Sequence, residues 1–243
     1  MIRQTDQIRS LILKCIVIVS AVWGTWLSAA GGQDAFMGGT HVFMFFTIQS
    51  NIAIALICLI GAVLLFRNRP VDNRWYVVKF VGTVSITLTG IVFCFVLAPT
   101  LGSYAWLWSN VLTHVIVPAA AVADFFVTGI YGTIKQEQVL LVTLPPIAYA
   151  IYAGIGYIAG WEFLEGIHYP YFFLNWGSPA GAFGFTKELP FMGCVWWILL
   201  LLLFLIGVGK LYLWILEKRR TSVFHNPEKT RYNKTRNQGE ICT

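Results

Sequence analysis

The sequence predicts an all-α, polytopic membrane protein with six transmembrane helices and with both termini in the cytoplasm. Hydrophobic residues make up 57% of the chain, charged residues only 12%, and the mean hydropathy is +0.69. This balance excludes an ordinary soluble domain. The apolar residues gather in six stretches, 11–30, 43–66, 80–98, 111–133, 139–159 and 190–216. Each has about 20 residues or more, enough for a helix to cross the roughly 30 Å hydrocarbon core of a bilayer.

Positive charge determines the predicted orientation. All of the 17 Lys and Arg residues except Lys187 fall at one set of alternate helix ends and connections. Cytoplasmic segments carry the excess of Lys and Arg, so this set should face the cytoplasm. The net charge of +6 therefore indicates contact with anionic lipid headgroups, and a nucleic-acid partner is not expected.

The first stretch has some features of a signal peptide. It has Arg3 and Arg9 before it and Lys14 near its start, and it ends at Ser28-Ala29-Ala30, a small-residue sequence that resembles a cleavage site. Its apolar run is longer than the roughly 7–15 residues of a signal-peptide core. We therefore expect a retained first helix.

The remaining elements follow from short links and one long loop. The short links are a Gly-rich one at 31–41, a charged one at 67–74 that contains Pro70, one at 99–110 with Trp106 and Trp108, and a tight turn at 132–138. The external loop 160–189 is long and aromatic, so we expect it to fold back on the bundle mouth or to lie among the headgroups. The transmembrane domain should thus span 1–217. The polar, basic segment 218–243 should form a disordered cytoplasmic tail.

Polar residues inside the spans are the candidates for function. The second stretch carries Thr47, Ser50 and Asn51 at positions i, i+3 and i+4, which share one helix face. The fourth opens with Asn110 and His114, again on one face at i and i+4. Polar groups in lipid are costly and usually face the bundle interior. The chain's 5 Cys residues have no metal-ligand spacing, and neither a metal nor an organic cofactor is expected.

Depth indicates which of these groups can meet. Both stretches enter from outside, near Phe43 and near Asn110, so Thr47 and His114 should each lie about 6 Å below the outer interface. A hydroxyl beside an imidazole can be a nucleophile with its general base. The alternative is structural, because Thr often bonds its own helix and a bundle His often serves packing.

The acid of the fourth stretch should play a different part. Asp124 lies ten residues beyond His114, hence about 15 Å deeper, too far to orient the imidazole. We expect it to hold the cytoplasmic half of the bundle through a basic partner such as Lys79 or Arg74.

Several short motifs also resemble a known family. They are Phe46-Thr47-Ile48-Gln49-Ser50-Asn51, His114 with Val117-Pro118 and Asp124, Gly90-Ile91-Val92-Phe93, and Tyr169-Pro170-Tyr171-Phe172-Phe173-Leu174. Over residues 40–217 the chain is similar to the bacterial branch of the androgen-induced-gene family. Animal members are six-span threonine hydrolases of fatty acid esters of hydroxy fatty acids. The resemblance implies a nucleophilic Thr47, an essential His114, a supporting Asp124 and a bacterial inner-membrane location. Cys94 and Asn175 depart from the residues usual in bacterial relatives.

Two functions follow as hypotheses. The first is an integral-membrane esterase that hydrolyses a lipid acyl ester, with Thr47 as nucleophile and His114 as base. In it Ser50, Asn51 or Asn110 would donate to the oxyanion, and 160–189 would form a lid. The residue that orients His114 is open among Asn110, His168, Glu162 and Glu165. The second is a non-enzymatic carrier or scaffold that uses Asp124 as its intramembrane polar site, with helices broken at Pro118 and Pro145-Pro146.

Overall fold

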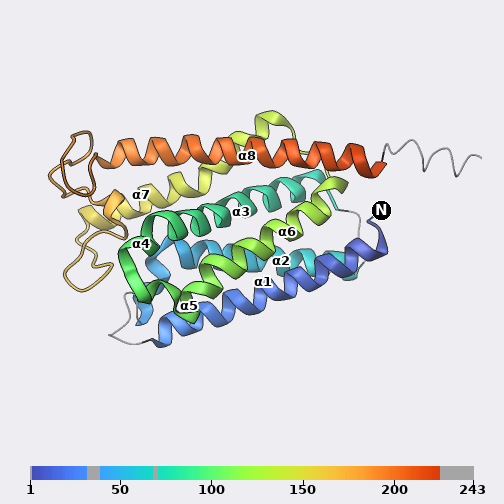
Figure 1. Cartoon of the computed structure of the whole chain (residues 1–243), viewed down its shortest axis with the longest axis horizontal. Coiled ribbons are helices and arrows are strands. Elements are labelled where there is room, and N and C mark those ends of the chain that lie inside the picture. Colours follow the sequence, from blue (N-terminus) through green and yellow to red (C-terminus); the bar gives the residue numbers. More distant parts are fainter. Residues whose placement is uncertain (1, 32–38, 68–70, 225–243) are drawn as a thin grey trace, which may run out of the picture.

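The computed structural model of the chain describes residues 2–31, 39–67 and 71–224, and it shows long helices running roughly along one axis (Figure 1). Within the described residues there is no β-strand, only two isolated bridges in the external loop. Six helical segments are long and apolar enough to cross a membrane. The chain is therefore an all-α, multi-pass integral membrane protein.

Eight α-helices and several tighter or wider helical turns build these spans within the described residues. The α-helices are α1 (Gln4–Ala30), α2 (Phe46–Phe66), α3 (Asn73–Val92), α4 (Ala98–Leu101), α5 (Trp108–Val111), α6 (Val117–Thr128), α7 (Leu144–Ile158) and α8 (Cys194–Phe224). The third span joins α3 to α4 through the π-helical turn Phe93–Leu97, and the fourth joins α5 to α6 through the π-helical turn Leu112–Ile116. The fifth begins with the 3-10 helix Gln136–Thr143, just before Pro145 and Pro146 start α7. Since Pro lacks an N–H, it is tolerated in the first turn of α7 but not further along.

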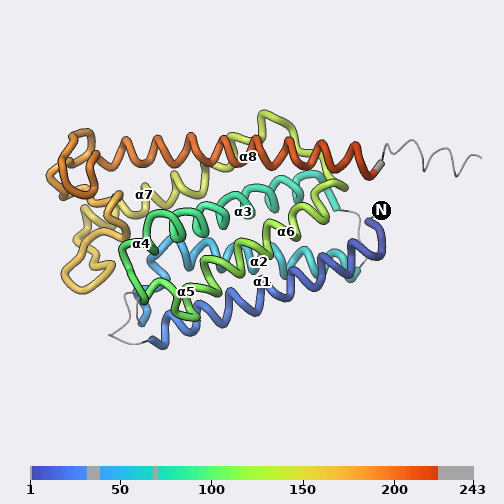
Figure 2. Tube along the Cα trace, in the orientation of Figure 1, coloured from blue at the N-terminus to red at the C-terminus, as the bar shows by residue number. Residues whose placement is uncertain are grey.

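The first four spans form the central bundle. α1 packs on α2 and α6, and α3 packs on α2 and α6 (Figure 2). α8 and α7 lie on one side of this group, where α8 contacts the 3-10 helix Gln136–Thr143 and α3. A large apolar cluster that includes Phe80, Phe125, Leu205 and Leu213 holds α8 against α3 and α6. The polar side chains described below lie between α1, α2, α3 and the fourth span.

The external loop folds back on the bundle, which is one of the two expected arrangements. Phe163, Phe173 and Leu174 of the loop are buried against Phe45 and Tyr149 in a second apolar cluster. Their burial brings Tyr171, which lies between them in sequence, onto the outer end of α2. The loop is thus part of the core at the outer end of the bundle.

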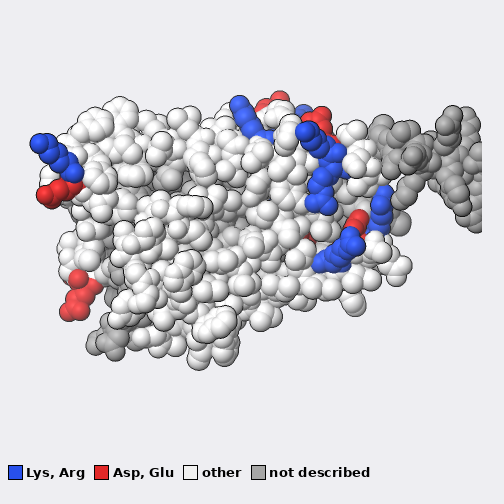
Figure 3. Space-filling model, viewed as in Figure 1, with Lys and Arg blue, Asp and Glu red and all other residues white. Residues whose placement is uncertain are grey.

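The two ends of the bundle differ in charge. Figure 3 shows Lys and Arg side chains gathered near the end where α1 starts and α8 stops, whereas the opposite end shows one Lys or Arg group and acidic side chains. This distribution agrees with the orientation that the positive-inside rule predicts. The orientation itself stays a prediction.

The first seven residues of the expected disordered tail are helical. α8 continues to Phe224, past the expected end of the membrane domain at Glu217. Lys218 lies 3.8 Å from the centre of the Trp214 ring, and Arg220 donates to the carbonyls of Ile130 and Gly132. These contacts explain why the helix persists beyond its apolar stretch. The rest of the expected tail, 225–243, lies outside the described residues.

We expect both termini to face the cytoplasm and Ser178 to face outside. Alkaline phosphatase, which is active only outside the cytoplasm, should be active when inserted at Ser178 and inactive when fused to the C-terminus. Green fluorescent protein fused to the C-terminus should fluoresce. An active C-terminal phosphatase would reverse the orientation.

Candidate functional site

Thr47 lies in the first turn of α2, at the outer end of the bundle. Its side chain is buried, and its backbone N–H belongs to the turn whose amides have no partner within the helix. The N-terminus of a helix is the positive end of its dipole. A negative charge that develops next to Thr47 would therefore be stabilised by α2 itself.

The His114 imidazole faces this hydroxyl. Thr47 Oγ1 lies 3.3 Å from His114 Nε2, and both side chains are buried, at 5% and 3% exposure. The expectation that the two residues meet at one depth is confirmed. Their catalytic role stays a prediction.

The hydrogen bonds of His114 select one tautomer. Nδ1 lies 3.1 Å from the backbone carbonyl oxygen of Asn110, which can only accept, so Nδ1 must carry the proton. Thr113 Oγ1 donates to the Ser109 carbonyl and lies 3.0 Å from the same Nδ1. Nε2 of the neutral ring is then an acceptor and can receive the Thr47 hydroxyl proton. The orienting group is thus a main-chain carbonyl, which no search for a polar side chain would have found.

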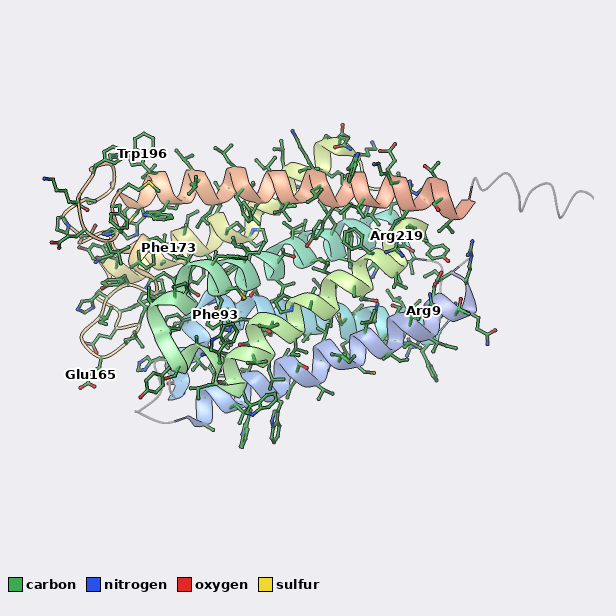
Figure 4. All side chains as sticks on the ribbon, viewed as in Figure 1. Arg9, Phe93, Glu165, Phe173, Trp196 and Arg219 are labelled. Atoms are coloured by element: carbon green, nitrogen blue, oxygen red, sulfur yellow. The ribbon has the colours of Figure 1, made fainter. Side chains whose placement is uncertain are left out.

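The other candidates for orienting His114 lie elsewhere. The Asn110 side chain donates to the Tyr104 carbonyl, and His168 contacts the Trp161 carbonyl. Glu162 and Glu165 are exposed, and Figure 4 shows Glu165 on the outer part of the loop, away from Phe93 in the bundle.

Local irregularity of the fourth span shapes the position of His114. The residue lies inside the π-helical turn Leu112–Ile116. Pro118, four residues later, has no N–H to bond the His114 carbonyl, and such a break favours a local change of helical pitch. Gly90 of α3 packs here, since a Cβ on it would lie 3.0 Å from the His114 carbonyl oxygen. Phe93, at the start of the other π-helical turn, Phe93–Leu97, stacks on the His114 imidazole with ring centroids 3.9 Å apart.

Tyr171 of the external loop completes the contacts of Thr47, and the sequence reasoning had not singled it out for a role. Its hydroxyl lies 3.4 Å from Thr47 Oγ1 and accepts from the Thr47 backbone N–H at 3.3 Å. Burial raises the pKa of the Tyr171 phenol. The group therefore stays protonated near neutral pH and can donate a hydrogen bond.

The polar neighbours on α2 are engaged in other bonds. Ser50 donates its proton to the Thr47 carbonyl and so must accept from Thr89 at 2.7 Å. Asn51 Nδ2 donates to the carbonyls of Thr47 and Thr113. Because these protons are already donated, the geometry does not support Ser50 or Asn51 in the expected role of oxyanion donor. The side-chain amide of Asn110 is engaged as well, since it donates to the Tyr104 carbonyl. These side chains brace the helix end that carries Thr47.

An apolar cavity adjoins the hydroxyl. It has a volume of about 60 Å³ and lies between α2, the third span, α7, α8 and the external loop. Its lining is apolar except for the polar groups of Thr47, Thr89 and Tyr171. Phe46 and Phe93 form the apolar wall next to Thr47 and His114. Only an aliphatic or aromatic ligand suits such walls.

Asp124 belongs to a separate buried cluster in the half of the bundle that is predicted to be cytoplasmic. Lys14 and Lys79 each place Nζ 2.6 Å from Oδ2 of Asp124, and Ser10 donates to Oδ1 at 2.5 Å. Lys79 also donates to Thr128. Lys79 was one of the two partners expected for Asp124. Lys14 was not expected as a partner, because its sequence position groups it with the basic residues that precede the first apolar run. The other expected partner, Arg74, instead makes an exposed pair with Asp72.

Comparison with known proteins does not identify a family: no protein-family model, curated protein or solved structure matches this chain. The chemistry has to be argued from the site itself. Among the described residues, no three His, Cys, Asp or Glu side chains gather as a metal site. What the geometry offers is a buried hydroxyl, an imidazole whose accepting nitrogen faces it, a phenol, and a helix N-terminus. This combination suits nucleophilic acyl transfer.

Asp124→Asn should destabilise the fold strongly. It leaves two buried ammonium groups without a countercharge, which should cost about 3–5 kcal/mol. Thermal unfolding in detergent, followed by intrinsic fluorescence, measures the effect. Lys14→Met is the matched control, because it leaves a one-to-one pair of Lys79 with Asp124, and it should be milder. A fully stable Asp124→Asn protein would contradict this structural role.

Proposed function

We propose that this protein is an integral-membrane esterase that hydrolyses an acyl ester of a lipid. The observation that carries the proposal is the pairing of Thr47 with His114 in a tautomer whose Nε2 can accept the hydroxyl proton. The pair adjoins an apolar cavity. A hydrolase for a water-soluble substrate would need a polar pocket, so the lining favours an acyl chain.

In the proposed reaction, Thr47 Oγ1 attacks the carbonyl carbon of the ester while His114 Nε2 takes the hydroxyl proton. The tetrahedral intermediate then collapses, the bond from carbon to the alcohol oxygen breaks, and His114 returns the proton to the leaving alcohol. A water molecule next attacks the acyl-Thr47 ester and gives its proton to Nε2. Release of the fatty acid returns that proton to Thr47.

The oxyanion is best served by Tyr171 and the main chain. The Tyr171 hydroxyl and the Thr47 backbone N–H both lie beside Thr47 Oγ1, the atom that becomes bonded to the reacting carbon. A protonated phenol and a backbone amide in the first turn of a helix are suitable donors for developing negative charge. The Thr47 N–H donates to the Tyr171 hydroxyl, so a substrate oxygen would replace that contact.

The family resemblance supports the same assignment. The motifs of the bacterial branch of the androgen-induced-gene family put its nucleophile on Thr47 and its histidine on His114. We propose membership of that family on this basis, with a bacterial inner-membrane location. For the alcohol that leaves in the reaction, we propose a lipid alcohol.

The carrier or scaffold hypothesis has less support. It depends on Asp124 as a polar site that a transported ion or proton reaches. Both carboxylate oxygens are already bonded to Lys14, and one also to Lys79. Neither the cavity beside Thr47 nor the groove described below is lined by Asp124.

Thr47→Ala and His114→Ala should each lower ester turnover by at least about 10³-fold, and the double variant should be hardly worse, because residues that act as one unit are non-additive. Thr47→Ser should retain part of the activity, since the hydroxyl survives. Ser50→Ala is the matched control and should be mild. The assay is hydrolysis of a 4-nitrophenyl acyl ester by the purified protein in detergent, with fluorophosphonate labelling as a second readout. A folded Thr47→Ala protein with wild-type turnover would end the hydrolase proposal.

Tyr171→Phe should reduce kcat by about 10²-fold while leaving KM nearly unchanged, because it removes a donor used mainly in the transition state. Tyr212→Phe is the control: its buried hydroxyl also pairs with a threonine, Thr87 at 3.0 Å, but away from the site. Equal kinetics for the two variants would remove Tyr171 from the mechanism. If Tyr171→Phe raised KM and left kcat unchanged, Tyr171 would contribute to substrate binding only.

A further inference from the structure

A second, larger hollow lies next to the candidate site. It is a groove of about 430 Å³ between α2, α3 and the start of the fifth span. Ala53 and Ile57 line it from α2, Val77 and Val81 from α3, and Leu144 from the fifth span. Its volume falls in the range of sites that bind small molecules, about 300–1,000 Å³.

The groove adjoins the site. Phe46 lines both the groove and the cavity beside Thr47. Ser50 lines the groove and bonds to Thr89, which lines the cavity. The Phe46 ring and the Ser50–Thr89 pair are therefore the partition between the two hollows.

The groove is polar at one end and apolar along the rest of its length. Gln49 and Ser50 lie at the end next to the site, and beyond Ala53 the lining is apolar apart from Ser85. Along α3 the distance from the level of Thr89 to Val77 is about 18 Å toward the cytoplasmic end, at 1.5 Å per residue. A molecule with one polar end and a long apolar tail matches this arrangement.

The cavity beside Thr47 is too small for such a tail. Its volume of about 60 Å³ is well below the roughly 300–1,000 Å³ of sites that bind small molecules, whereas the groove has about 430 Å³. A long chain whose carbonyl lies at Thr47 must continue elsewhere. The groove is the adjoining space with sufficient volume.

We propose that the groove binds the long acyl chain of the ester substrate, with the carbonyl at Thr47, the chain passing Phe46 and the tail directed toward the cytoplasmic leaflet. This inference rests on the proposed esterase function and adds the place in the bundle where the acyl chain lies. The Phe46 ring, which is partly exposed and packs edge-on against Tyr149, has to rotate to admit the chain.

Ala53→Trp tests the groove. Ala53 is exposed to the groove, so the indole fills it without replacing a packed side chain. Hydrolysis of 4-nitrophenyl palmitate should fall by at least about tenfold in kcat/KM, whereas 4-nitrophenyl acetate should change by less than about twofold, because the lost contacts are those of the tail. Leu59→Trp is the control, since Leu59 is exposed but does not line the groove. It should leave both esters unchanged.

A binding experiment separates this inference from the proposed function. A palmitic acid analogue with a photoreactive diazirine near its methyl end should crosslink to groove residues of α2 and α3 in the full-length Thr47→Ala protein. Crosslinking should be lost in Thr47→Ala/Ala53→Trp and kept in Thr47→Ala/Leu59→Trp. Crosslinks confined to other surfaces, or palmitate and acetate hydrolysis changing equally in Ala53→Trp, would overturn the groove assignment. Unchanged acetate hydrolysis in Thr47→Ala would instead overturn the esterase proposal.

Discussion

Polar groups between the six spans have to find their partners within the protein, because hydrocarbon offers none. The bundle meets this requirement in two buried layers. The outer layer joins Thr47, His114 and Tyr171, and the inner layer joins Lys14, Lys79 and Asp124. Each layer links residues from at least three segments that are distant in sequence. The two layers thus determine which helices lie side by side and at what height.

The two layers are built for different purposes. In the inner layer charges are paired at 2.6 Å and reinforced by Ser10 and Thr128, an arrangement that resists exchange with a ligand. In the outer layer neutral groups meet at 3.3–3.4 Å and border an apolar cavity. Looser contacts between neutral groups can be replaced by a substrate at little cost, whereas breaking a buried ion pair is expensive. This difference is the physical reason to locate chemistry at Thr47 and stability at Asp124.

Departures from regular helix surround the outer layer. π-Helical turns interrupt the third and fourth spans at the level of the site, and they carry Phe93 and His114, whose rings stack. Such turns are often found at functional sites, since they re-aim a side chain without ending the helix. The loop adds Tyr171 from outside the six spans. The site therefore combines a helix end, a re-aimed imidazole and a loop residue that packs against the outer end of the bundle.

The sequence by itself determined the helical class, the number of spans and the shared depth of Thr47 and His114. These features follow from apolar length, alternation of charge and the 1.5 Å rise of a helix, all of which are local. Tertiary structure decided the rest. Lys14 as a partner of Asp124 and Tyr171 beside Thr47 depend on helix rotation and on how the loop folds back. The seven residues by which α8 passes Glu217, to Phe224, likewise depend on contacts of Arg220 with the end of the fourth span. Rotation and long-range contacts leave no periodic trace in the sequence, because they are set by the packing of all six spans together.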